Sequence, residues 1–228
     1  MTRQPIDPRS FAAQMLAALL VLSAPLARAA DATDPHAPQR DHATKGEAAA
    51  DPHAHHHHML EAPPPVIRST ISYSMPDVTL VRADGERVQL ARELDDGRPV
   101  LLDFVYTTCT TICPVLSQTF AEVQKRLGPD AAKIKMISIS IDPEEDTPAR
   151  LLDYAKRFHA GAQWQFYTGT VEASIATQRA FDAYRGDKMS HQPVTFFRGA
   201  PGQPWVRLDG FATPDALVSE LRPMVAQK

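Results

Sequence analysis

An apolar segment that runs directly into both cysteines constrains the fold of this chain most. Residues 100–106 read Val-Leu-Leu-Asp-Phe-Val-Tyr, which is typical of a strand buried on both faces. A polar loop with Cys109 follows, and Pro114 suits the first position of a helix over 114–127, because its missing N–H costs nothing there. The segment therefore predicts a strand, a reactive loop and a helix, with Cys113 at or beside the helix N-cap.

That position favours the thiolate form of a cysteine. The start of a helix offers unpaired amides and the positive end of the dipole, and the thiolate is the form that attacks disulfides and binds metals. The spacing is Cys-x-x-x-Cys, one residue longer than in Cys-x-x-Cys dithiol oxidoreductases. It leaves room for a metal between the sulfurs, while a disulfide remains possible. A reactive or metal-binding role explains the pair better than a structural disulfide does. A disulfide that closes so short a loop adds less stability than one that closes a long loop.

Strands and helices alternate along the rest of the globular part. A hairpin around Asp84-Gly85 comes first. The later patterns predict strands at 134–141, 164–167, 194–197 and 206–208, and helices at 148–158, 171–184 and from Pro214 onward. This order predicts an α/β, thioredoxin-like fold: a central mixed sheet flanked by helices, with an N-terminal β-hairpin extension. Cys109 and Cys113 fall at the carboxyl end of a strand, where open α/β sheets hold their reactive loops.

The first 29 residues have the pattern of a secretory signal peptide. Arg3 and Arg9 give a basic start, 11–26 is mostly apolar, and Ala-Arg-Ala ends at Ala29. Because the apolar run is short for a membrane span, we expect cleavage near Ala29 and a periplasmic location rather than a membrane anchor. Removing this segment moves the net charge from −3 to about −5, and no basic stripe remains that would attract nucleic acid.

Residues 30–65 are rich in Asp, His, Pro and Ala and contain no aromatic residue, which predicts a disordered linker. Seven of the nine histidines lie within 36–58. Neutral imidazoles in such a segment chelate Cu, Zn or Ni, so this linker is either a weak metal collector or simply a solvated tail. The globular, copper-binding domain is then predicted to span 66–228.

His191 is the candidate third member of the cysteine site. It comes directly before the strand 194–197, and in a thioredoxin-like sheet the loop before this strand packs against the cysteine loop. A histidine there would complete a site of two sulfurs and one nitrogen, which suits Cu(I) and also supports Cu(II). The alternative is an ordinary surface histidine. Pro193, at the end of the same loop, is a candidate cis proline.

Other polar or soft side chains are weaker candidates. Asp103 precedes the cysteine loop on its strand and is either a residue that tunes the thiols or a polar residue at the sheet margin. Asp142 ends a strand and is a candidate to lie near the site, although the acidic turn that it opens is typical of the start of a capped helix. His159 is explained by a helix C-terminus. Met136 is expected in the core, and Met189 is a soft atom two residues from His191.

Three ordered motifs are similar to those of the Sco (SenC/PrrC) family. They are the Cys-Thr-Thr-Ile-Cys-Pro segment at 109–114, the Ser-Ile-Ser-Ile-Asp-Pro and Asp-Thr-Pro segments within 138–148, and His191 before a strand. The resemblance covers roughly 66–228. It implies a thioredoxin-fold copper chaperone that assembles the CuA centre of cytochrome c oxidase, and it implies that the two cysteines and His191 are the copper ligands.

Three functions remain open at the level of sequence. The leading one is a monomeric, non-enzymatic metallochaperone. The second is a thiol-disulfide oxidoreductase in which Cys109 attacks a disulfide of a copper-site client, Cys113 resolves the mixed disulfide, and a thioredoxin-like protein supplies electrons. The third is a peroxidase, which needs an arginine such as Arg179 or Arg185 to reach the cysteine loop.

Overall fold

A single eight-stranded mixed sheet organises the part of the chain that the computed structural model describes, residues 64–226. The predicted signal peptide, 1–29, and nearly all of the predicted linker, 30–65, lie outside the described residues, as do the histidines at 36–58. The strands are β1 (Ile67–Ile71), β2 (Thr79–Arg82), β3 (Arg87–Gln89), β4 (Val100–Val105), β5 (Lys135–Ser140), β6 (Trp164–Thr168), β7 (Val194–Arg198) and β8 (Trp205–Asp209).

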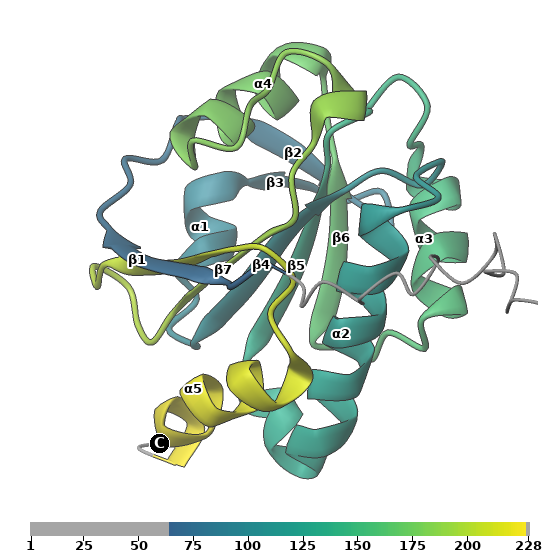
Figure 1. Ribbon diagram of the computed structural model, residues 1–228. Helices are drawn as coiled ribbons and strands as arrows, with labels where there is room; N and C mark the ends of the chain where they lie inside the picture. The colour runs from purple at the N-terminus through teal and green to yellow at the C-terminus, as the bar shows by residue number, and fades with distance from the viewer. Residues whose placement is uncertain (1–63, 227–228) are drawn as a thin grey trace, which may run out of the picture. The chain divides into compact units, whose positions relative to one another are not determined.

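Five α-helices and two short 3-10 helices connect or follow the strands within residues 64–226 (Figure 1). They are α1 (Leu90–Leu94), α2 (Ile112–Leu127), η1 (Gly128–Lys133), α3 (Pro148–Arg157), α4 (Val171–Ala180), η2 (Lys188–Ser190) and α5 (Pro214–Ala226). No helix in this described part is long and apolar enough to cross a membrane.

The strand order is β1-β8-β7-β4-β5-β6-β2-β3. Strands β4, β5 and β6 run parallel, whereas β7 pairs with β4 antiparallel. The predicted β2–β3 hairpin is confirmed and is added to β6 at one edge. The mixed central sheet flanked by helices is therefore the one that the strand and helix order predicted, and it puts the cysteine strand β4 in the middle.

The alternation of side chains along β4 gives the sheet two cores. Leu101 faces the core that contains side chains of α2, α3 and α5. Leu102 and Phe104 face the opposite core, with side chains of α1 and α4. Because successive residues of a strand point to opposite faces, a continuous apolar run is what a strand covered on both sides requires. This confirms the interpretation of 100–106 as a buried strand.

Three local predictions were wrong or incomplete. Strand β1 was missed, because it is an edge strand with mostly exposed side chains and no strong apolar alternation. Helix α4 ends at Ala180 rather than at 184, since Asp182 adopts a positive φ of 51° that a right-handed helix cannot continue through. The bond before Pro193 is trans, as no peptide bond within 64–226 is cis.

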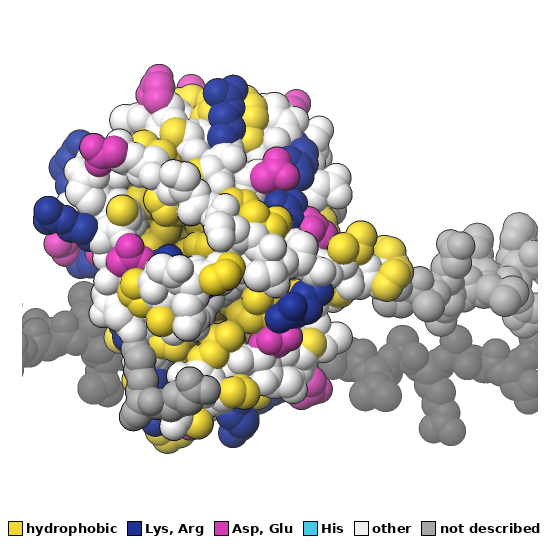
Figure 2. All heavy atoms as spheres, turned by 90° about the vertical axis from the view of Figure 1, so that its left-hand side faces the viewer, with side chains coloured by type: hydrophobic (Ala, Val, Ile, Leu, Met, Phe, Trp, Pro, Cys, Tyr) yellow, Lys and Arg dark blue, Asp and Glu magenta, His cyan; other side chains and the backbone are white. Residues whose placement is uncertain are grey.

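Opposite charges alternate on the surface near β1. Figure 2 shows Lys and Arg interspersed with Asp and Glu on this face, around hydrophobic side chains that show in a shallow hollow. On this face neither sign of charge gathers into a patch.

Candidate metal centre

The loop between β4 and α2 brings the two cysteines together. Cys109 lies in the loop, and its N–H donates to the carbonyl of Tyr106 at 3.2 Å. Cys113 lies in the first turn of α2, and its N–H donates to the sulfur of Cys109 at 3.3 Å. Both are free thiols, 7% and 0% exposed. The predicted pair is thus assembled at the carboxyl end of β4.

The helix begins earlier than predicted, and this changes which cysteine is the thiolate. The N-cap is Thr111, so Cys113 is the second residue of α2 rather than its cap. Burial raises the pKa of Cys109, but hydrogen bonds, foremost from the Cys113 N–H, outweigh it and lower that pKa to about 7. Burial, together with the neighbouring Cys109, raises the pKa of Cys113 well above its usual value. The two sulfurs therefore differ: Cys109 is the one that loses its proton more readily near neutral pH, and Cys113 is held as a buried thiol.

This difference predicts selective alkylation. In the reduced, metal-free protein we expect iodoacetamide to modify Cys109 first, with a rate that rises through a midpoint near pH 7, because only the thiolate reacts and it forms above the pKa. Tandem mass spectrometry locates the label within the peptide that carries both cysteines. Cys109→Ser should remove the fast phase, whereas equal labelling of both cysteines at neutral pH would contradict the assignment.

Asp146 holds the cysteine loop in place, a role that its place in the Asp-Thr-Pro motif did not reveal. Its fully buried carboxylate accepts from the N–H and the hydroxyl of Thr107, at 3.1 and 2.6 Å, and from the hydroxyl of Ser140 at 2.6 Å. The residue lies in the acidic turn before α3, so this turn is more than the start of a helix. The carboxylate joins that turn, β5 and the cysteine loop.

Asp103 is fully buried in β4 and does not lie at the sheet margin. One carboxylate oxygen accepts from the hydroxyl of Ser138 at 2.6 Å, and the other has no hydrogen-bond partner. Burial raises the pKa of Asp103 to about 7, although the hydrogen bond from Ser138 opposes this. The negative charge of Asp103 is one of the effects that raise the pKa of Cys113. This agrees with the interpretation of Asp103 as a residue that tunes a thiol.

His191 lies on the neighbouring loop and is bound to the cysteine strand. It is 5% exposed, and its Nε2 lies 3.1 Å from the carbonyl oxygen of Phe104 in β4. Because a carbonyl can only accept, Nε2 carries the hydrogen and Nδ1 keeps its lone pair. Burial, with a smaller effect of the Arg185 charge, lowers the pKa of His191 below its usual value. A neutral ring fixed through one nitrogen by a backbone carbonyl is the arrangement that metal-binding histidines have.

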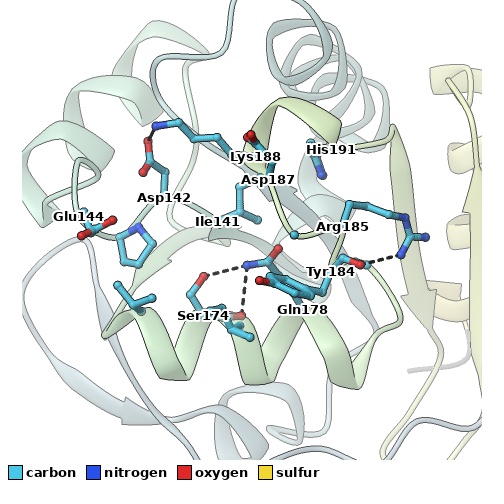
Figure 3. Close-up of a pocket in the computed structure, with 15 residues that line it drawn as sticks. Ile141, Asp142, Glu144, Ser174, Gln178, Tyr184, Arg185, Asp187, Lys188 and His191 are labelled. Atoms are coloured by element: carbon cyan, nitrogen blue, oxygen red, sulfur yellow. Dashed lines mark hydrogen bonds and ion pairs between the residues drawn. The ribbon is translucent and has the colours of Figure 1, made fainter.

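A pocket of about 370 Å³ opens beside His191. Figure 3 shows that the loop carrying Arg185 and His191 forms one side of it and that Ser174 and Gln178 of α4 line another. Asp142 lines the same pocket and binds Lys188, with 2.5 Å between Oδ2 and Nζ. Asp142 therefore does lie beside the His191 loop, in an ion pair that ties this loop to the end of β5.

The three predicted ligands are neighbours but are not preassembled. Within residues 64–226, no three His, Cys, Asp or Glu side chains are grouped closely enough to hold a metal ion. The donor set nevertheless fits a soft ion. It consists of the Cys109 thiolate, the sulfur of the neighbouring Cys113, and the neutral imidazole of His191 with a lone pair on Nδ1.

Other candidates lie elsewhere. His159 is exposed beyond α3 with a φ of 52°, the left-handed position that commonly ends a helix. Met136 is buried in the core. Arg179 stacks on Tyr184, and the Arg185 guanidinium donates to the Tyr184 carbonyl. In the described part of the chain no arginine hydrogen-bonds either cysteine, which weighs against the peroxidase.

Comparisons with known sequences agree on one family. The SCO1/SenC family model matches residues 72–226. The chain is similar to the SCO1 protein homolog of Bacillus subtilis, at 28% identity over 167 residues, which are 68% of this chain and 85% of that protein. It is 31% identical over 107 residues to the mitochondrial SCO1 homolog 1 of Arabidopsis thaliana, covering 46% of this chain and 31% of that protein.

Solved structures have the same fold, which confirms the predicted fold class. One is BsSco, a member of the Sco family of cytochrome c oxidase assembly proteins with a disulfide switch; it is 26% identical, has a TM-score of 0.57, and the match covers 71% of this chain and 99% of that one. Another is Bradyrhizobium japonicum ScoI with copper bound, at 24% identity and a TM-score of 0.56, with coverage of 66% and 99%. At 24% identity, the likeness to this ScoI structure shows only that the two proteins share a fold.

Proposed function

The chain belongs to the SCO1/SenC family, as the resemblance of its motifs predicted, and on that premise we propose that it is a copper-binding protein of cytochrome c oxidase assembly. Copper is its cargo, and the client that receives it is the CuA site of an oxidase subunit. A relative in the same fold supports this, because it is a member of the Sco family of cytochrome c oxidase assembly proteins.

One observation carries the proposal: two sulfurs and a neutral imidazole lie around the end of β4. Cys109 supplies a thiolate near neutral pH, and Cys113 supplies a second sulfur whose proton leaves when the metal binds. His191 supplies Nδ1, since its Nε2–H is held by Phe104. Such a set of soft and borderline donors selects Cu(I) and also accommodates Cu(II), in preference to hard cations.

The site requires a reduced protein, which leads to a direct test. We expect the reduced protein to bind one copper per chain in an anaerobic titration against a Cu(I) competitor. The same protein with the Cys109–Cys113 disulfide should bind none at this site, because both sulfur lone pairs that act as thiolate ligands are lost. A competitor strong enough to clear free histidines removes any contribution of 36–58. Equal binding by the two forms would contradict the proposal.

Thiol-disulfide exchange is the second candidate function, and the unequal cysteines favour it. The Cys109 thiolate would attack a disulfide of the client, form a mixed disulfide and release one client thiolate. Cys113 would then attack Cys109, form the intramolecular disulfide and release the second client thiol. Two electrons pass to the client, and a thioredoxin-like reductant restores the pair. His191→Ala separates the functions: copper retention should fall, whereas dithiol exchange should persist.

We also propose a periplasmic location, which rests on residues 1–29 alone. Export would place the cysteines in an oxidising compartment, where the pair must be kept reduced for copper to bind. Fractionation of cells that express the protein, followed by N-terminal sequencing, should find it in the periplasm with its new N-terminus near residue 30. Recovery with the membrane and with residues 1–29 intact would contradict this.

A further inference from the structure

A methionine is held outside the molecule beside the buried cysteines. Met189, in η2, is 75% exposed, whereas Cys109, Cys113 and His191 are 7%, 0% and 5% exposed. Its backbone position is fixed, because the Met189 N–H donates to the carboxylate of Asp187 at 2.8 Å. The Met189 side chain is therefore accessible to solvent and to a partner, unlike the three predicted ligands.

The hydroxyl of Tyr106 connects this methionine to the cysteine site. It donates to the sulfur of Met189 at 3.8 Å, and the Tyr106 side chain lies in one buried cluster with Cys109 and Cys113. The Met189 sulfur thus contacts a residue that packs with both cysteines. Lys188 lies near the same ring. Its ammonium is 5.9 Å from the centre of the Tyr106 ring and pairs with the carboxylate of Asp142.

We propose that Met189 is the outer ligand through which Cu(I) enters and leaves the buried site, an inference that rests on the proposed copper function. A client's donor atoms cannot reach a copper surrounded by Cys113 and His191, because both side chains are buried. Ligand exchange therefore needs a soft donor at the rim that binds the ion while the inner bonds break. A thioether suits this step, since it binds soft metals and needs no proton removed.

The chemistry of the step is simple ligand exchange. Copper stays Cu(I); its bonds to the two sulfurs and His191 are replaced in turn by bonds to Met189 and then to the acceptor. No electron moves, and protons return only to the cysteine sulfurs that copper leaves. Met189 therefore lowers the barrier in both directions and contributes little to the affinity at equilibrium.

The test is the rate at which a small Cu(I) chelator removes copper. We expect Met189→Leu, in the otherwise unchanged chain loaded anaerobically with one copper, to slow both removal and uptake by about tenfold. The equilibrium affinity should change by less than a factor of about two, because uptake and release share the same barrier. A chelator has no surface to dock, so the effect cannot come from lost partner contacts. Met189→His, which restores a donor atom, should recover most of the rate.

Met224→Leu is the matched control. Met224 belongs to α5, and its thioether packs against the core that contains Leu101. This substitution should leave both rates unchanged. Unaltered rates in Met189→Leu would overturn the inference, and so would a large fall in affinity with faster release, which would make Met189 a resident ligand. A wild-type chain that binds no copper in the titration would instead refute the proposed function itself, so the two failures are distinguishable.

Discussion

Replacing Cys109, Cys113 or His191 singly should abolish tight one-to-one copper binding. In structural zinc sites four ligands share a binding free energy of about 10–16 kcal/mol, so a single soft ligand is worth roughly 3 kcal/mol, or about a hundredfold in affinity. We expect at least this loss in Cys109→Ser, Cys113→Ser and His191→Ala. The measurement is competition with a Cu(I) chelator of known affinity, with the Cu(II)–thiolate absorption as a second readout.

His159→Ala is the matched control for the histidine, because His159 is exposed at the end of α3 and makes no contact with the cysteine loop within the described chain. It should bind copper like the wild type. His191→Ala also leaves the Phe104 carbonyl without its partner, so circular dichroism must confirm that this variant is folded. Wild-type affinity in a folded His191→Ala would show that the imidazole only supports β4 and that the site consists of the two sulfurs.

Replacing Asp146 by alanine should be the most destabilising change outside the apolar core. The fully buried carboxylate accepts three hydrogen bonds, two from Thr107 and one from Ser140. Removing it leaves these donors unpaired in the interior, and each such loss costs about 1–3 kcal/mol, so we expect the free energy of unfolding to fall by about 3–5 kcal/mol. Urea denaturation followed by circular dichroism measures this loss.

Asp153→Ala is the control for this change, since the Asp153 carboxylate lies on the exposed side of α3 and pairs with the equally exposed Lys156. Its expected effect is below about 0.5 kcal/mol. In a protein that remains folded, Asp146→Ala should also weaken copper binding, because Thr107 anchors the loop that carries Cys109. A loss of stability no larger than in Asp153→Ala would show that the loop holds its shape without the carboxylate.

Sequence patterns predicted the elements that depend on neighbours along the chain. The continuous apolar run of β4 and the alternation in β5 follow from burial on one or both faces, and Thr147 with Pro148 marked the start of α3 correctly. The edge strand β1 carries no such pattern, because it gains its hydrogen bonds from β8 and buries little. The end of α4 was equally hidden, since a single positive φ at Asp182 decides it.

The candidate site divides in the same way. The sequence by itself determined that both cysteines follow a central strand and precede a helix, and that His191 comes just before the strand β7 that pairs with β4. Only the tertiary structure decided which sulfur is the thiolate, because the amide that stabilises Cys109 belongs to Cys113 after the loop has folded back. It likewise decided the contacts of Asp146 and Met189. Their partners, Thr107 and Tyr106, lie 39 and 83 residues away in sequence, and no local pattern can encode a contact between side chains that only the packed sheet brings together.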